Sequence, residues 1–281
     1  MEIQNKTDFS LIADAITFYS EQGNNLFTDQ IAREKLEEPL EEARKKIKKW
    51  ANATPEELVA YLHPERIKRA ITSTVNAIKN NEACIHDIHI QSMLPSELEN
   101  GGKNLSVSYY FYNTLFGRII IASTIKGICF LAFSDKEDEE ALYKLKQRFP
   151  NALYKEAEDK YQREALLAFG DKTGCAHHVA LHVKGTSFQI HVWEKLLKIP
   201  LGGLMSYSSL TDDPKFSHAL GAAVGANPVA YLVPCHRVVR ATGVFGEYHW
   251  GSPRKAALIS WEAAQKKSIE DVCGNLDTTI I

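Results

Sequence analysis

A change of periodicity near residue 105 constrains the fold more than any other feature of the sequence. Before it, residues 8–75 place apolar side chains three or four positions apart, which is the spacing of amphipathic helices. After it, residues 105–135 are rich in β-branched and aromatic residues with Asn and Gly between them, which predicts a small antiparallel sheet. The chain has 281 residues, enough for more than one domain. We therefore expect an α+β protein with several domains.

The helical segment contains one clear apolar stripe and one clear helix start. The stripe consists of Leu36, Leu40, Ala43, Ile47 and Trp50. The stretch ATPEEL offers Thr54 as a cap, Pro55 in the first turn and Glu57 three residues after the cap, which is the pattern of a capping box. Residues 76–104 are polar, include LPSELENGGKN and are expected to be a linker.

Further helices are predicted after the sheet. KEDEEALYKLKQRF and EDKYQREALLAFG look amphipathic, and SFQIHVWEKLLKI places Phe188, Val192 and Leu196 on one face. SYSSL and PKFSHALGAAVGAN then have the spacing of a helix-turn-helix, with a second helix of small residues. The expected parts are a helical module at 8–75, the linker at 76–104, a small α/β subdomain at 105–180 and a further helical domain at 184–268.

Composition excludes some classes of protein. The formal net charge of −2 gives no global attraction to nucleic acid, so any contact with DNA has to be local. The N-terminal residues lack the basic start and apolar core of a secretory signal, and the apolar runs are interrupted and too short for a membrane span. We expect a soluble, cytoplasmic, monomeric protein with no membrane partner.

The stretch VAYLVPCHRVVR, residues 229–240, places a thiol beside an ionisable ring at the end of an expected buried strand. The five cysteines include no C-x-x-C pair, and an odd count at wide spacing argues against both a zinc ribbon and a disulfide framework. Cys235 is then either an inert core thiol or a nucleophile. A nucleophile needs a base, and the adjacent His236 could act through a water, oriented by Glu262. From the residues alone, the alternative interpretation, a buried inert Cys beside a structural His, also stays open.

Four stretches in order resemble the O6-alkylguanine-DNA alkyltransferases of the Ada type. They are GTSFQIHVWEKLLKIPLGGLMSYSSL, GANP, PCHRV at 234–238 and GVFGEYHWG. The resemblance spans about residues 105–264. It implies a ribonuclease H-like α/β subdomain followed by a helical, winged-helix-like subdomain that carries the helix-turn-helix and the reactive cysteine. It also implies transfer of an alkyl group from guanine O6, with thymine O4 as an alternative, to that cysteine, once per molecule and without cofactor or metal. The base has to leave the duplex first.

The resemblance assigns roles to individual residues of the reaction. Cys235 corresponds to the alkyl acceptor, His236 to the water-linked base and Glu262 to the carboxylate that orients the base. Asn227 corresponds to the Asn-Pro hinge between recognition helix and active site. Tyr248 corresponds to the tyrosine whose hydroxyl donates to guanine O6 as the bond breaks.

The resemblance also implies contacts with DNA. Tyr207 corresponds to the tyrosine that presses on the phosphate as the base rotates, and the Val238 carbonyl corresponds to the group that reads the guanine amino group. Without the resemblance, Tyr207 and Tyr248 would be read as core residues. The remaining expected contacts with substrate or DNA are Phe216, Ser217, His218, Gly221, Arg237 and Trp250.

Two departures from the family pattern bear on DNA binding. The family has an arginine nine residues before the hinge asparagine, where it fills the gap left by the flipped base, and this chain has His218 there. Asp212 and Asp213 lie in the expected turn, where they would face phosphates. Because phosphate neutralisation dominates affinity for DNA, we expect weak binding. Trp250, with His249 before it, narrows the expected alkyl pocket and favours methyl groups.

The N-terminal segment resembles the AraC-type helix-turn-helix of Ada-type regulators, in a degenerate form. Glu37, Glu38, Glu41 and Glu42 lie where a recognition helix would meet DNA, and RKKIKK is typical of a solvated face. No four-cysteine cluster is present, so a zinc phosphotriester domain is not expected. Two alternatives to repair stay open: a DNA-binding transcriptional regulator of the Ada/AraC type with weak or lost repair, and a lesion-binding alkyltransferase-like protein, which the presence of Cys235 disfavours.

Overall fold

The computed structural model describes residues 8–22, 38–81, 87–134, 137–169, 178–211, 215 and 217–277. The chain divides into two units. The helical unit comprises Met1–Glu82, Pro200–Ser206 and His236–Ile281, and the sheet unit comprises Ala83–Ile199 and Tyr207–Cys235. This division crosses the domain boundaries expected from the sequence, because the N-terminal helices share a unit with the C-terminal part of the expected catalytic domain.

The predicted antiparallel strands form the centre of the sheet unit. They are β2 (Ser106–Thr114), β3 (Gly117–Thr124) and β4 (Gly127–Phe133), and β3 pairs antiparallel with both neighbours. Three more strands run parallel to their neighbours: β1 (Asp87–Ser92), β5 (Leu153–Glu156) and β6 (His178–Val183). The six strands have the order β1-β6-β4-β3-β2-β5, so the sheet is larger and more mixed than the sequence predicted.

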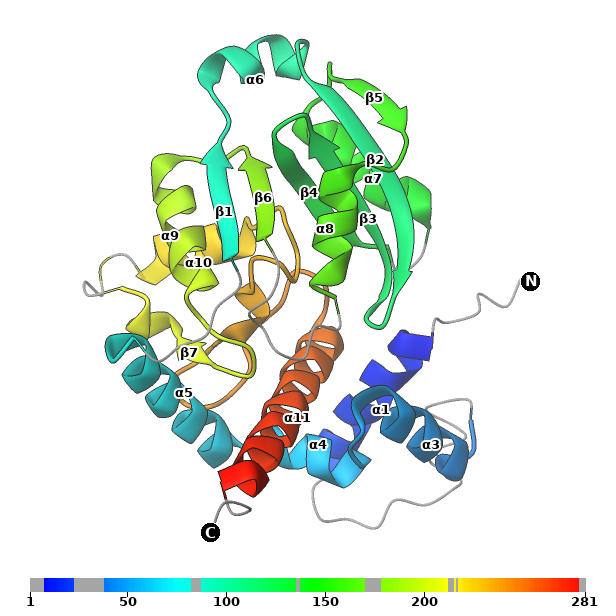
Figure 1. Cartoon of the computed structure of the whole chain (residues 1–281), viewed down its shortest axis with the longest axis vertical. Coiled ribbons are helices and arrows are strands. Elements are labelled where there is room, and N and C mark those ends of the chain that lie inside the picture. The colour runs from blue at the N-terminus through cyan, green and yellow to red at the C-terminus, as the bar shows by residue number, and fades with distance from the viewer. Residues whose placement is uncertain are drawn as a thin grey trace. The chain divides into compact units, whose positions relative to one another are not determined.

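Helices cover both faces of this sheet. In Figure 1, α8 (Lys160–Leu167) lies in front of the strands and α7 (Asp138–Arg148) lies behind them. The α7 face has an apolar core, which includes Leu145, Phe149 and Ile120. The helices α9 (Ser187–Leu197) and α10 (Ser217–Gly225) also belong to the unit.

Two of the three residues predicted to form the apolar face of α9 are buried. Val192 and Leu196 are buried, whereas Phe188 is 40% exposed. Phe188 is the second residue of the helix, and a first-turn residue has no preceding turn to pack beside it. The Trp193 indole, which that prediction omitted, is buried and donates to the Ala223 carbonyl of α10.

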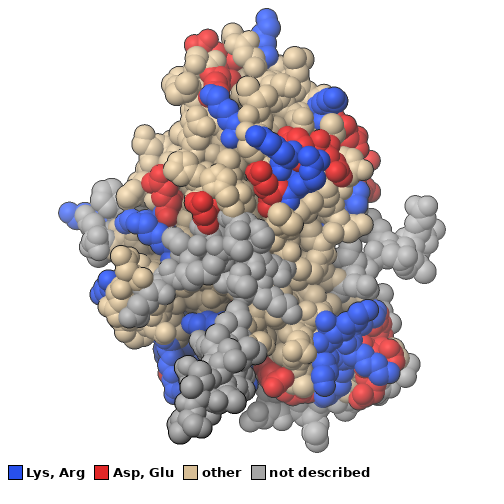
Figure 2. Space-filling view, in the orientation of Figure 1, with Lys and Arg blue, Asp and Glu red and all other residues tan. Residues whose placement is uncertain are grey.

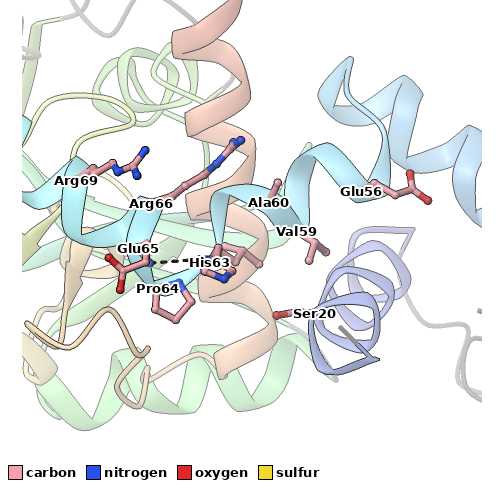
Figure 3. A pocket seen from close by; sticks show the side chains of 10 residues that line it. Ser20, Glu56, Val59, Ala60, His63, Pro64, Glu65, Arg66 and Arg69 are labelled. Atoms are coloured by element: carbon pink, nitrogen blue, oxygen red, sulfur yellow. Dashed lines mark hydrogen bonds between the residues drawn. The ribbon is translucent and has the colours of Figure 1, made fainter. Parts of the chain in front are cut away.

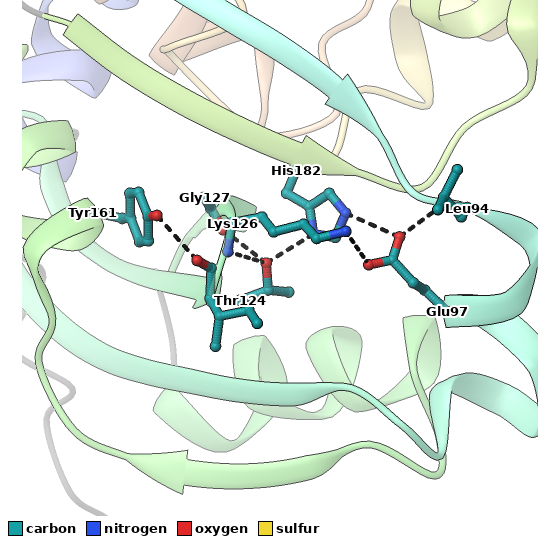
Figure 4. Close-up of polar contacts among 8 residues, drawn as sticks. Leu94, Glu97, Thr124, Lys126, Gly127, Tyr161 and His182 are labelled. Atoms are coloured by element: carbon teal, nitrogen blue, oxygen red, sulfur yellow. Dashed lines mark hydrogen bonds and ion pairs between the residues drawn. The ribbon is translucent and has the colours of Figure 1, made fainter.

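The residues expected to be a linker contain regular structure. Within 76–104, β1 pairs with β6, and α6 (Pro95–Gly102) follows it. Figure 4 shows what ties α6 to the sheet: Glu97 accepts from Lys126 at 2.8 Å and contacts the His182 ring at 3.3 Å. The other ring nitrogen of His182 lies 2.8 Å from the Thr124 hydroxyl. Because the partners of Glu97 are distant in sequence, the local polarity of residues 76–104 did not indicate these contacts.

The helical unit confirms the predicted helix start. Its N-terminal helices are α1 (Asp8–Gln22), α3 (Leu40–Ala51), α4 (Pro55–Tyr61) and α5 (Pro64–Lys79). Glu57 N–H donates to the Thr54 hydroxyl and Thr54 N–H donates to the Glu57 carboxylate, so the capping box is complete. Ala43 and Ile47 of the predicted stripe are buried, and Leu36 lies outside the described residues.

The C-terminal part of the helical unit completes its core. The long helix α11 (Ser252–Asp277) packs against α1, α3 and α4. A short parallel ribbon joins β7 (Met205–Ser206) to β8 (Val238–Val239). No helix among the described residues combines the length and apolar character that crossing a membrane requires.

The charges of α3 agree with the interpretation of RKKIKK as a solvated face. Arg44 pairs with Glu56 at 2.5 Å, Lys45 pairs with Glu42 at 2.8 Å, and Lys46 pairs with Glu38. Figure 2 shows basic and acidic side chains next to one another in this region. A surface that binds DNA phosphates needs uncompensated positive charge, and these pairs reduce it.

The buried His182 makes stability depend on pH. Burial lowers the pKa of His182 below its usual 6.5, and Glu97 only partly opposes this shift. The unfolded chain therefore takes up the proton first, so we predict that the free energy of unfolding falls as pH drops below 6.5. The slope that one such group adds is at most about 1.4 kcal/mol per pH unit.

Urea unfolding between pH 7 and pH 5 checks this expectation. His182→Asn should flatten the slope, whereas His89→Asn, a change at an exposed histidine of β1, should leave it unchanged. Equal slopes in all three proteins would contradict the role given to His182.

Candidate active site

The segment before the thiol is buried and fixed, but it is not the strand that the sequence predicted. Val229 forms an isolated bridge with Leu131 of β4, and Ala230 N–H donates to the Leu131 carbonyl at 2.9 Å. Tyr231 has a positive φ of 65°, which an extended strand cannot include. Its ring stacks on Phe169 at 4.6 Å, so aromatic packing stabilises the bend. Cys235 then begins a short 3-10 helix, Cys235–Arg237.

Asn227 contacts the thiol directly. Its side-chain nitrogen lies 3.1 Å from Cys235 Sγ and 2.8 Å from the Val233 carbonyl, and its oxygen accepts from Val229 N–H. Asn227 and Cys235 are each 5% exposed. A donor to sulfur stabilises a thiolate relative to a thiol. The residue expected to be a hinge therefore contributes to the environment of the Cys235 thiol.

In the helical unit, His236 and Glu262 form the predicted pair. Their atoms Nε2 and Oε1 are 2.9 Å apart, and both side chains are almost fully buried. Burial lowers the pKa of His236, and the contact with Glu262 only partly opposes the shift, so the ring is neutral at pH 7. A carboxylate only accepts hydrogen bonds, so Nε2 carries the ring proton and Nδ1 is the basic nitrogen.

Glu262 accepts more hydrogen bonds than the sequence predicted. Arg237 donates to both of its oxygens, through Nε and Nη2, at 2.9 Å each, and Gly202 N–H donates at 3.2 Å. Burial alone would raise the pKa of Glu262, but Arg237 and His236 outweigh it and hold the pKa at about 2. The carboxylate is therefore ionised at neutral pH.

This arrangement corrects the expectation for Arg237. The side chain was expected to contact DNA, but it is 5% exposed and forms a two-pronged ion pair with Glu262. A buried carboxylate requires a partner of opposite charge, and Arg237 fills that need. The sequence did not indicate this ion pair, since an arginine near a DNA-binding motif is usually interpreted as a phosphate contact.

Gly202 is a contact of Glu262 that sequence reasoning missed. Its φ is +66°, and a Cβ atom there would lie 3.1 Å from the Glu262 carbonyl oxygen. Only glycine fits such a position without strain, and this placement lets its N–H reach the carboxylate. The Pro-Leu-Gly-Gly stretch before MSY was the available signal, because adjacent glycines mark a backbone with an unusual conformation.

Lys255 is a second missed residue. Its Nζ donates to the Val238 carbonyl at 2.6 Å, and the side chain is 1% exposed. It also lies 6.0 Å from the centre of the Tyr248 ring, which in turn packs edge-on against Trp250. Val238 of the PCHRV motif is thus linked to Tyr248 and Trp250 of the GVFGEYHWG motif through one lysine and one aromatic pair of the helical unit.

The expected DNA-facing residues are only partly described. His218 is exposed on α10, and a Cβ at Gly221 would meet nothing within 4 Å, so this part of the helix is open. Tyr207 lies in a 3-10 helix, Tyr207–Ser209, within the first of the two short helices that were predicted. Phe216, Asp212, Asp213 and the side chain of Ser217 lie outside the described residues.

A cavity of about 680 Å³ lies elsewhere in the helical unit. Figure 3 shows its lining, which comes mainly from α4 and α5 and includes His63, Arg66 and Arg69. None of the predicted site residues lines it. Among the described residues, no group of three or more His, Cys, Asp or Glu side chains is arranged to hold a metal ion.

The ion pair between Arg237 and Glu262 allows a test of stability. Arg237→Met removes the charge but keeps most of the apolar stem, leaving a buried carboxylate uncompensated. We expect a loss of about 3–5 kcal/mol in the free energy of unfolding, measured with denaturant. The control Arg240→Met, at an exposed arginine, should change it by less than about 0.5 kcal/mol. Similar effects of both changes would show that Arg237 has no special electrostatic role.

Comparison with known proteins gives two matching family models. Residues 187–264 match "6-O-methylguanine DNA methyltransferase, DNA binding domain" and residues 107–159 match "6-O-methylguanine DNA methyltransferase, ribonuclease-like domain". The second match confirms the ribonuclease-like character expected for the small α/β subdomain. Both matched ranges lie within the part of the chain in which the sequence resembled the alkyltransferases.

Individual relatives agree with these matches. The inducible methylated-DNA–protein-cysteine methyltransferase of Bacillus subtilis is 38% identical over 147 residues, which cover 50% of this chain and 82% of that protein. The bifunctional transcriptional activator/DNA repair enzyme Ada of Escherichia coli is 34% identical over 180 residues, which cover 62% of this chain. The matched region spans only about half (51%) of the Ada protein.

A solved structure also matches. The crystal structure of Mycobacterium tuberculosis OGT in complex with DNA is 28% identical, covers 56% of this chain and 94% of that chain, and has a TM-score of 0.47. The two domain matches and the coverage of the Bacillus subtilis protein establish the relationship. The chain belongs to the 6-O-methylguanine DNA methyltransferase family.

Proposed function

We propose that this protein repairs DNA by transferring a methyl group from O6 of methylguanine to Cys235, once per molecule. The single observation that carries the proposal is a buried thiol that accepts from Asn227 and is followed directly by a neutral histidine paired with an ionised carboxylate. An inert core thiol needs no such surroundings. Cys129 is a second buried thiol, and it lies in the apolar core of the sheet unit.

The reaction balances without a cofactor. The bond between the methyl carbon and guanine O6 breaks, and a bond between that carbon and Cys235 Sγ forms. The thiol proton goes to His236 through a water, and Glu262 stabilises the resulting positive charge. The guanine gains one proton as the methyl group leaves, which balances the proton that the thiol lost. The Tyr248 hydroxyl donates to O6 as negative charge develops there. The thioether does not hydrolyse, which limits each molecule to one turnover.

The proposed substrate is an alkylated base in double-stranded DNA. The Val238 carbonyl reads the guanine amino group, and Lys255 holds that carbonyl in place. Trp250, beside Tyr248, favours methyl over larger groups, and O4-methylthymine is a second candidate substrate. Tyr207 presses on the phosphate, and His218 enters the gap left by the flipped base.

The affinity that we propose for DNA is low. Arg237 is committed to Glu262, so Lys215 and Arg240 remain as the basic residues of the segment from 206 to 250. Few phosphates are then neutralised, and the non-specific component of affinity is small. We place the activity in the cytoplasm, where the protein meets DNA as a monomer.

Intact-protein mass spectrometry tests the proposed reaction. After incubation with a duplex that contains one O6-methylguanine, the protein should gain one methyl group in a stoichiometric amount. Cys235→Ala should abolish the gain, whereas Cys129→Ala, at a thiol whose pKa is about 12, should retain it. A gain that survives Cys235→Ala would overturn the assignment of the acceptor. No gain in the native protein would overturn the proposed activity.

The departure at His218 allows a second test of the same proposal. His218→Arg restores a longer, charged side chain at the position that fills the gap. We expect the rate of methyl transfer at low DNA concentration to rise about fivefold, the factor that roughly 1 kcal/mol of added stacking represents. The control Lys215→Arg conserves charge on the neighbouring exposed residue and should change the rate little. A rate unchanged by His218→Arg would show that residue 218 does not enter the gap.

A further inference from the structure

Helix α11 presents two sets of polar side chains to different partners within the helical unit. One set, Lys255 and Glu262, contacts the Val238 carbonyl and the His236 and Arg237 side chains. The other set, Trp261 and Gln265, donates to the N-terminal helices. Lys255 and Glu262 are seven residues apart and share a face of the helix, and Trp261 and Gln265 are four apart and share another.

The second set contacts the end of α3. The Trp261 indole N–H donates to the Trp50 carbonyl at 3.3 Å, and the Gln265 side-chain N–H donates to the Ala51 carbonyl at 3.1 Å. Carbonyl groups in the last turn of a helix have no partner within the helix. Two directional bonds to consecutive carbonyls fix α11 along its axis as well as around it, which apolar packing alone does not achieve.

Aromatic packing surrounds these bonds. The rings of Trp50 and Trp261 have centroids 6.5 Å apart, and Phe9 of α1 lies 5.9 Å from Trp50 in an edge-on arrangement. The Arg254 guanidinium, 5% exposed, lies 5.0 Å from the centre of the Phe9 ring. The N-terminal helices thus bury the face of α11 that does not carry Glu262.

The N-terminal helices also contact the segment that supplies Gly202. Leu204 N–H donates to the Thr74 hydroxyl of α5 at 3.0 Å, and Thr74 is 3% exposed. Leu204 is two residues after Gly202, whose N–H donates to Glu262. The carboxylate and one of its donors are therefore both held in place from α3 and α5.

We propose that the N-terminal helices position the Glu262 carboxylate through Trp261 and Gln265, and that they form part of the alkyl-transfer apparatus. Trp261 and Gln265 are positioning residues, because they act through α11 and do not touch substrate. A shift of α11 by a fraction of an ångström changes all the hydrogen bonds of Glu262 together. This inference rests on the proposed function, in which Glu262 orients the base of the thiol.

Single-turnover kinetics of Trp261→Phe and Gln265→Ala test the inference on the full chain. Each change removes one donor, and Trp261→Phe keeps an aromatic ring in the core. We expect the maximal rate of methyl transfer to fall about fivefold for each, the factor that one lost hydrogen bond represents. The DNA concentration at half-maximal rate should stay the same. The control Ser268→Ala, whose hydroxyl donates within α11 to the Ala264 carbonyl, should match the native protein.

A double-mutant cycle separates positioning from a general loss of stability. If Gln265 acts through Glu262, Gln265→Ala should lower the rate less than twofold in a Glu262→Gln background. An equal fall in both backgrounds, or native rates in folded Trp261→Phe and Gln265→Ala, would overturn the inference.

Reaction of Cys235 with iodoacetamide, followed against pH without DNA, gives a readout that does not require the methyl-transfer reaction. The positioning role predicts that the profile shifts to higher pH in Gln265→Ala and in Trp261→Phe, and remains in place in Ser268→Ala. A profile that stays in place in all variants would overturn the inference. If the native protein transferred no methyl group but the profile still shifted, the proposed substrate would be wrong while the positioning role stood.

Discussion

The Glu262 carboxylate is the common acceptor on which the helical unit depends. It receives hydrogen bonds from Gly202, His236 and Arg237, which come from two separate segments of the chain. A buried carboxylate is tolerated only when its charge is compensated and its oxygens are satisfied. The positive φ of Gly202 and the burial of Arg237 both follow from that requirement.

The chemistry proposed for Cys235 divides between two kinds of contact. In the sheet unit, Asn227 donates to the sulfur, and the bend at Tyr231 fixes the segment that presents it. In the helical unit, an ionised Glu262 holds a neutral His236, which directly follows Cys235 in the chain. Neither contact needs a cofactor. The arginine of the PCHRV motif pairs with the carboxylate, and the proposal of weak DNA binding rests on that pairing.

The sequence predicted the features that depend on local pattern. The Thr54 capping box, the three antiparallel strands and the helices α7, α8 and α9 follow from residues close together in the chain. The site residues came from motif resemblance, and the pairing of His236 with Glu262 follows the role carried over with it. The preference of Arg237 for a carboxylate over phosphate depends on burial, which no local pattern encodes.

Several features that sequence reasoning missed involve partners far apart in the chain. Trp261 and Gln265 bond to residues 211 and 214 positions away, so neither helical periodicity nor composition could reveal them. The polar residues 76–104 appeared to be a linker because their partners lie far away in the chain. β1 pairs with β6, and Glu97 contacts His182. A helix-turn-helix resemblance at the N-terminus suggested a separate module, whereas the core of the helical unit includes both those helices and α11.

The ionisation state of Glu262 is the most direct test of this account. Carbon-13 NMR of the glutamate side-chain carboxyl groups, with Glu262→Gln to identify the signal, would follow it as the pH is lowered. The account predicts that the Glu262 signal does not titrate while the protein stays folded, since its pKa is held at about 2. A midpoint at or above the ordinary value of 4.5 would contradict it, because a protonated Glu262 could neither pair with Arg237 nor orient His236 as a base.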